Sequence, residues 1–195
     1  MKIKQTFLTI SRILVIGCVI ASVMSSCAMF KKTESIDLKS EARTTDQLID
    51  DSQLERSIEK TLKNTSEKFD QSNISVLSSN GWILLVGEVP EASMILQAET
   101  ITNEVPGVVA VHNYIKVDEN RTLLESAHDN WIKLKVRNHL GIDPKFPSQK
   151  ITVHTEKGIV YLMGQISSEH VSKADANARE VKGVQDVIKV FEVIE

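Results

Sequence analysis

The stretch GWILLVGEV, residues 81–89, decides the fold, because it returns in altered form as GIVYLMGQI, residues 158–166. Each stretch opens on a glycine, runs through apolar residues and reaches a second glycine in the same register. This pattern is typical of a strand that is entered through a glycine turn. Two copies of one folding unit therefore follow each other along the chain.

The repeat extends beyond these two strands in both directions. ISV at 74–76 matches ITV at 151–153. Six further positions keep the register: Ala98, Val105, Gly107, Val108, Val111 and Val117 match Ala174, Val181, Gly183, Val184, Val187 and Val193. Each copy reads as helix, strand, turn, strand, helix, turn and strand, the order αββαβ. We predict an α+β fold in which two helices cover one face of a three-stranded mixed sheet in each copy.

Small size and the repeated glycines give two more expectations. A copy of about 70 residues is marginal on its own, so we expect the two copies to pack on each other. Gly81 and Gly158 suit tight hairpin turns with positive φ, and Gly107 and Gly183 suit turns after a helix. Trp82, inside the first copy's strand, is expected in the core or in an interface.

The N-terminus has the layout of an export signal. A basic start, MKIKQTFLTISR, precedes the apolar run ILVIGCVIASVM, and SSC follows. The run is too short for a comfortable membrane span of about 20 residues, so residues 1–26 are predicted to be a signal peptide. An uncleaved anchor helix is the alternative, which the polar serines disfavour.

Both cysteines of the chain, Cys18 and Cys27, lie in this segment, so no disulfide is expected in the folded part. VMSSC resembles the lipobox of bacterial lipoproteins, with Met24 where leucine is usual. The resemblance implies cleavage before Cys27 and lipidation of that residue; Cys18 is the alternative. Ala28 after the cysteine implies sorting to the outer membrane. Residues 27–45 are polar and aperiodic, and we interpret them as a lipidated, flexible tether.

No catalytic motif is found in the sequence. The five histidines, His112, His128, His139, His154 and His170, lack a metal-ligand spacing. There is no G-x-S-x-G motif and no phosphate-cradling loop. We therefore expect no enzyme activity, no cofactor, no metal and no nucleic-acid partner.

Charge distinguishes the copies. Residues 46–120 contain 5 Lys and Arg against 13 Asp and Glu, a net charge of −8, whereas residues 122–195 contain 10 of each, a net charge of 0. A negatively charged membrane would repel the first copy and tolerate the second.

The first helix of each copy carries the same core stripe. Aligning Asp51 with Asp129 places three apolar residues of one helix over three of the other at i, i+4 and i+8. The stripes are Leu54, Ile58 and Leu62 in the first copy and Ile132, Val136 and Leu140 in the second.

The opposite face of the second helix differs from that of the first. It carries Trp131, Leu134 and Asn138, with Lys135 and Arg137 on its flanks. Lys133 lies nearer the core edge. The equivalents of the first three are Gln53, Arg56 and Lys60, so the fold requires no apolar residue there.

An indole and a leucine beside long basic side chains form the pattern of an interfacial helix. Each base near an anionic surface contributes on the order of 1 kcal/mol, so three bases predict weak, salt-sensitive binding. The alternative is that Trp131 and Leu134 are buried against the first copy or a partner protein.

The helix, the G-x-(apolar)4-G-(E/Q)-(V/I) strand, the alanine of the second helix and the G-V-x-x-V turn resemble the BON domain of bacterial envelope proteins. The resemblance covers residues 46–120 and 122–195, the second copy more closely. Together with the predicted signal peptide, the resemblance implies a dual-BON outer-membrane lipoprotein on the periplasmic face. It further implies that the protein binds phosphatidylglycerol-like anionic phospholipid, concentrates at cell-division sites and supports envelope integrity. The matching family helix contacts phospholipid, which implies that role for Trp131, Lys133, Leu134, Lys135, Arg137 and Asn138. A periplasmic protein-interaction adaptor or stress chaperone using the same patch is the alternative.

Overall fold

The computed structural model describes residues 45–194, with side chains from residue 50 onward. The predicted signal peptide at 1–26, the lipidation site Cys27 and the tether as far as residue 44 lie outside the described residues.

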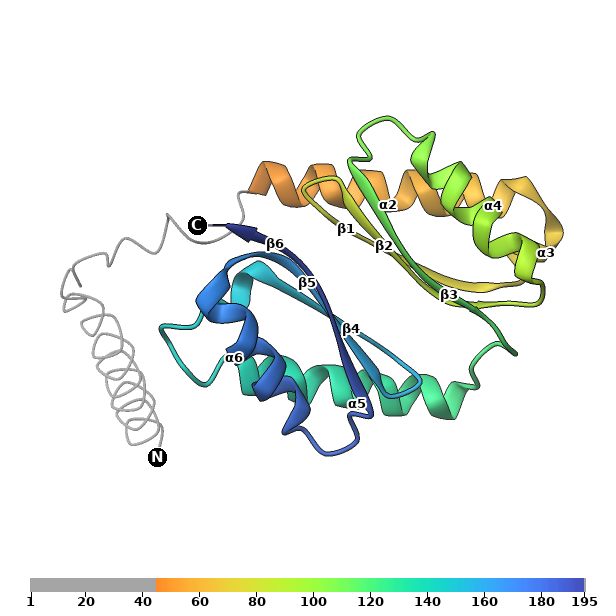
Figure 1. The fold of residues 1–195 in the computed structure, drawn as a ribbon. Helices are drawn as coiled ribbons and strands as arrows, with labels where there is room; N and C mark the ends of the chain where they lie inside the picture. Colours follow the sequence, from red (N-terminus) through yellow and green to blue (C-terminus); the bar gives the residue numbers. More distant parts are fainter. Residues whose placement is uncertain (1–44, 195) are drawn as a thin grey trace, which may run out of the picture. The chain divides into compact units, whose positions relative to one another are not determined.

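The first unit contains two long helices and three strands (Figure 1). In chain order these are α2 (Thr45–Thr65), the one-turn helix α3 (Glu67–Asp70), β1 (Asn73–Ser79), β2 (Trp82–Val89), α4 (Ala92–Asn103) and β3 (Ala110–Val117). The sheet order is β1-β2-β3, with β1 antiparallel and β3 parallel to the central strand.

The second unit repeats this arrangement. It consists of α5 (Leu123–Leu140), a 3-10 turn η3 (Ser148–Lys150), β4 (Ile151–Glu156), β5 (Ile159–Ser167), α6 (Ser168–Arg179) and β6 (Asp186–Ile194). Its sheet, β4-β5-β6, is mixed in the same way. The predicted αββαβ order and α+β fold are confirmed; α3 and η3, each about one turn long, were not predicted.

Both helices of a unit pack on one face of its sheet. In the first unit the fully buried core takes side chains from α2, α4 and β2: Ile58, Leu62, Met94, Ala98, Ile83 and Leu85. In the second unit the corresponding side chains come from α5, α6 and β5: Ile132, Val136, Leu140, Ala174, Ala178, Val160 and Leu162. The predicted core stripes are confirmed, with Leu54 partly buried against the first core.

The remaining sheet faces contribute to a third apolar cluster. It joins Leu84 and Val86 of β2 to Tyr161 and Met163 of β5, and Trp82 packs against it partly buried. The central strands are therefore buried on both faces, which explains their unbroken apolar runs. The expectations that the copies pack on each other and that Trp82 lies in the core or in an interface are confirmed.

Tight hairpin turns join the first two strands of each sheet. Asn80 and Gly81 have φ values of 53° and 78°, and Lys157 and Gly158 have values of 47° and 77°. Positive φ at both central positions defines a type I′ turn, which suits the twist of a two-residue hairpin. The predicted role of the two glycines is confirmed.

A buried aspartate of the preceding helix fixes each turn. In the second unit the Asp129 carboxylate accepts hydrogen bonds from the N–H groups of Lys157, at 2.8 Å, and Gly158, at 2.9 Å. In the first unit Asp51 accepts from the N–H of Asn80 at 3.2 Å and from the Ser78 hydroxyl at 2.6 Å. The helix and the hairpin of each unit are thus tied together at a matching position.

Candidate functional site

Helix α5 begins at a capping box. The Thr122 hydroxyl accepts a hydrogen bond from the Glu125 N–H at 3.2 Å, and the Glu125 carboxylate accepts one from the Thr122 N–H at 2.7 Å. The Thr122 N–H, and the Thr122 hydroxyl at 2.8 Å, both donate to the Glu125 carboxylate and so lower its pKa. At the other end the Gly141 N–H donates to the Arg137 carbonyl at 3.1 Å. Both ends of the helix are therefore set locally.

The inner side of α5 fixes its rotation about its axis. Ile132, Val136 and Leu140 are fully buried in the second core, and Asp129 holds the hairpin turn. With four inward residues anchored, the side chains on the opposite side are directed away from the sheet.

The outer side carries the apolar pair that the sequence singled out. Trp131 is 45% exposed and Leu134 is 59% exposed. Neither side chain is buried under the first unit. For the residues that the structure describes, this excludes the alternative that Trp131 and Leu134 are buried against the first copy. Lys135, Arg137 and Asn138 are also exposed, whereas Lys133 is half-buried toward the core edge. Five of the six predicted residues therefore form an open face, and the sixth borders it.

The Trp131 indole lies between two neighbours on the same helix. The Lys135 ammonium sits over the ring, 3.4 Å from its centroid, one turn further along. The His128 imidazole stacks beside it, with ring centroids 6.1 Å apart and an interplanar angle of 23°. An exposed cation–π contact contributes about 0.5–1 kcal/mol, enough to orient the indole without immobilising it.

The positive charge of this face is not neutralised locally. Within residues 50–194, no carboxylate forms an ion pair with Lys133, Lys135 or Arg137. Their charges stay available to an external anion. The corresponding residues of α2 that replace the apolar pair, Gln53 and Arg56, are exposed as well.

Two residues of this face were not predicted. The His128 ring lies beside that of Trp131. Leu124, seven positions before Trp131 and 81% exposed, falls on the same side of the helix. The i−7 spacing could have revealed Leu124, because seven residues make nearly two full turns. The apolar ridge is therefore longer than the Trp131–Leu134 pair.

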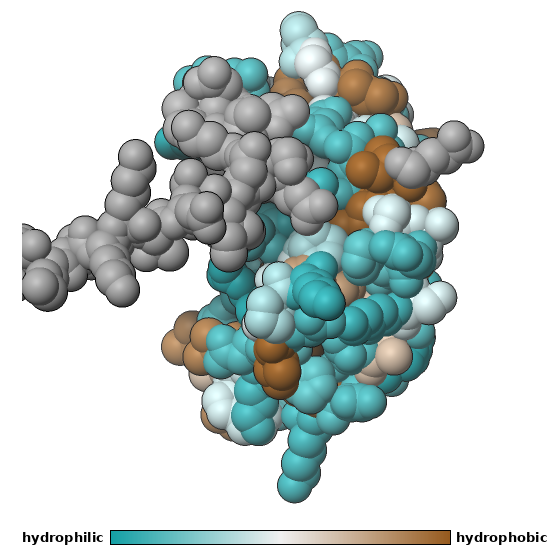
Figure 2. Space-filling model, turned by 90° about the vertical axis from the view of Figure 1, so that its left-hand side faces the viewer, coloured by the Kyte–Doolittle hydropathy of each residue, from teal (hydrophilic) through white to brown (hydrophobic). Residues whose placement is uncertain are grey.

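Hydrophobic residues on the face drawn in Figure 2 lie in small patches separated by hydrophilic ones. None of the described helices is long and apolar enough to cross a bilayer. No cluster of three or more potential metal ligands occurs in the described part of the chain.

The BON-domain family model matches the chain twice, at residues 50–119 and 128–195. Together with the two αββαβ units, these matches show that the chain belongs to the BON-domain family.

Three relatives show how far the similarity extends. The outer membrane lipoprotein DolP of Haemophilus influenzae is 28% identical over 179 residues, which cover 92% of this chain and 90% of that protein. The 21 kDa hemolysin of Actinobacillus pleuropneumoniae is 29% identical over 147 residues, covering 75% and 76%. An uncharacterized protein in the gshII 5′ region of Anaplasma centrale is 33% identical over 119 residues, covering 60% and 79%.

Proposed function

We propose that the chain is a non-enzymatic outer-membrane lipoprotein, lipidated at Cys27 and facing the periplasm, that docks on anionic phospholipid through the outer face of α5. Docking on a phosphatidylglycerol-like lipid would support envelope integrity and place the protein at division sites. Similarity to an outer membrane lipoprotein over nearly the whole chain supports the location.

One observation carries the lipid proposal. Trp131 and Leu134 are exposed between unpaired basic side chains on α5, whereas the same positions of α2 hold Gln53 and Arg56. The first domain forms its core without an apolar pair at these positions. The pair in the second domain therefore serves a contact outside its own core. An indole at headgroup level, a leucine below it and bases at the phosphates fit an anionic membrane surface.

The strength expected of this face is modest. Lys133, Lys135 and Arg137 contribute about 1 kcal/mol each near an anionic surface, and burial of the indole adds apolar stabilisation. Lys135 must exchange part of its contact with Trp131 for a lipid phosphate, which offsets some of this gain. The acyl chains at Cys27 would hold the domain near the bilayer and raise its effective concentration there.

Vesicle flotation with the mature chain carrying Cys27→Ser tests the proposal. We expect binding to phosphatidylglycerol vesicles but not to phosphatidylcholine vesicles. Lys135→Glu should weaken binding by about 2 kcal/mol, near 30-fold, because it removes one attractive charge and adds a repulsive one. Trp131→Ala should also release the chain.

Matched controls lie elsewhere on the surface. Lys60→Glu makes the same charge change on α2, and Leu96→Ala removes a side chain that is 70% exposed on α4. Both controls should bind like the parent. If Lys60→Glu and Lys135→Glu weaken binding equally, overall charge and not the α5 face determines it. If the α5 variants bind vesicles normally but lose an envelope protein that is crosslinked from position 131, the adaptor function replaces the lipid one.

A further inference from the structure

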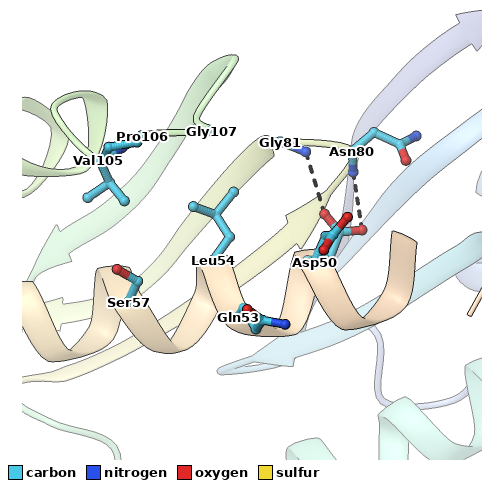
Figure 3. A pocket seen from close by; sticks show the side chains of 10 residues that line it. Asp50, Gln53, Leu54, Ser57, Asn80, Gly81, Val105, Pro106 and Gly107 are labelled. Carbon is cyan, nitrogen blue, oxygen red and sulfur yellow. Dashed lines mark hydrogen bonds between the residues drawn. The ribbon is translucent and has the colours of Figure 1, made fainter. Parts of the chain in front are cut away.

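A groove of about 620 Å³ lies beside α2 in the first BON domain (Figure 3). The N-terminal half of α2, the β1–β2 turn and the turn after α4 form its walls. Its principal side chains are Asp50, Gln53, Leu54, Ser57, Val105 and Pro106. All of them belong to the first domain, so the groove is separate from the α5 face.

The two carboxylates at one end of the groove have different roles. The Asp51 carboxylate accepts hydrogen bonds from the N–H groups of Asn80, at 3.2 Å, and Gly81, at 3.5 Å. Asp51 is thereby committed to the hairpin turn. Asp50 is exposed and, among residues 50–194, has neither a hydrogen-bond nor an ion-pair partner through its side chain. One carboxylate therefore remains available to a ligand.

The second domain fills the same place with larger side chains. His128, Trp131 and Lys135 stand where the first domain has Asp50, Gln53 and Ser57.

The space around the two glycines that follow α4 and α6 shows this difference in filling. A Cβ built on Gly183 would lie 3.6 Å from the His128 Nε2 atom, whereas one built on Gly107 would meet only Leu54, at 3.8 Å and beyond. Because both domains have the same fold, the hollow in the first is a property of its sequence.

The charge and shape of the groove indicate which kind of ligand it fits. The groove is lined by two carboxylates and, among the described residues, by no basic side chain, and its domain has a net charge of −8 from 5 basic and 13 acidic residues. Leu54, Val105 and Pro106 provide apolar surface for an alkyl stem, while Asp50 can pair with a cationic head.

From these features we infer that the groove binds an arginine or lysine side chain on an exposed segment of a partner protein. The inference does not rest on lipid docking, because the groove and the α5 face share no residue. The first domain would then recognise a basic protein segment while the second contacts a different surface.

A titration with a penta-arginine peptide tests the inference. The mature chain carrying Cys27→Ser is followed by amide chemical shifts at about 20 mM salt, where an exposed ion pair is least screened. We expect shifts at residues 50–57 and 105–107, and weaker binding at about 150 mM salt. Asp50→Asn should weaken binding about threefold or more, in line with the loss of an exposed ion pair. Ser57→Lys, which introduces the cation found at Lys135, should abolish it.

The controls separate the groove from a diffuse acidic field. Asp70→Asn removes the same charge on α3, at the other end of the helical segment, and Ser57→Gln enlarges the same side chain without charge. Both should bind the peptide within about twofold of the parent.

Two results would overturn the inference. Equal weakening by Asp70→Asn and Asp50→Asn would show that the peptide follows the overall charge. Tighter peptide binding after Lys39→Gln with Arg43→Gln would show that the chain's own tether segment, and not a separate partner, occupies the groove.

Discussion

Replacement of Asp129 by alanine should destabilise the second domain severely. Asp129 is 2% exposed, and its carboxylate accepts hydrogen bonds from the N–H groups of Lys157, at 2.8 Å, and Gly158, at 2.9 Å. A hydrogen bond to a charged group contributes about 1.5–3 kcal/mol, and each N–H left buried without a partner adds to the loss. Two such bonds give an expected loss of about 3–5 kcal/mol, a large share of the about 5–15 kcal/mol that stabilises a typical domain.

Urea unfolding followed by far-UV circular dichroism measures this loss. Asp129→Asn, which keeps one acceptor oxygen, should lose about 1.5–3 kcal/mol. Asp175→Ala serves as the control, because that aspartate is only partly buried and pairs with Arg179, at 3.1 Å, and Lys189, at 3.6 Å, so its loss should cost about 1 kcal/mol. A loss below about 1 kcal/mol for Asp129→Ala would refute the view that this carboxylate ties the helix to the hairpin.

Three further predictions concern other buried positions. Burial raises the pKa of the Glu88 carboxyl, so its contribution to stability is present at low pH and is lost as the pH rises through the folded-state pKa. Chemical denaturation should therefore find Glu88→Gln equal to the parent or up to about 1 kcal/mol more stable at pH 7, with no such gain near pH 4. Gly164→Ala should block folding of the second domain, because the added Cβ would lie 2.1 Å from the Lys150 carbonyl oxygen. Gly141→Ala is the control and should fold, because its added Cβ would have its nearest neighbour at 3.5 Å. Circular dichroism distinguishes the two variants. Burial raises the pKa of Tyr161 to about 12, so an ultraviolet absorbance titration should show one tyrosine ionising only there, or together with unfolding.

The fold was predictable because the chain contains two copies of one unit, which can be compared with each other. Gly81 with Gly158 and the two helical stripes identified the repeat, its element order and the residues that each core requires. The same comparison isolated Trp131 and Leu134, since subtracting the shared core positions leaves them without an internal role. Their exposure depends on tertiary packing, which spacing alone does not determine.

What was missed depends on contacts between distant segments. The bonds from Asp129 to Lys157 and Gly158 span 28 and 29 residues, so no local pattern reveals them. An aspartate within a helix also reads as an ordinary surface residue. The groove beside α2 was missed for a related reason. It arises where side chains of the first domain are smaller than their counterparts in the second, as Ser57 is smaller than Lys135.

The most direct test of the lipid account is the fluorescence of Trp131 on membranes. The chain has two tryptophans, so Trp82→Phe in the mature chain carrying Cys27→Ser leaves the α5 indole as the sole reporter. With phosphatidylglycerol vesicles the account predicts a blue-shifted emission and quenching by brominated acyl chains, and with phosphatidylcholine vesicles neither change. An unshifted, unquenched spectrum on phosphatidylglycerol vesicles that nevertheless retain the protein would contradict it, because the chain would then be bound through another surface.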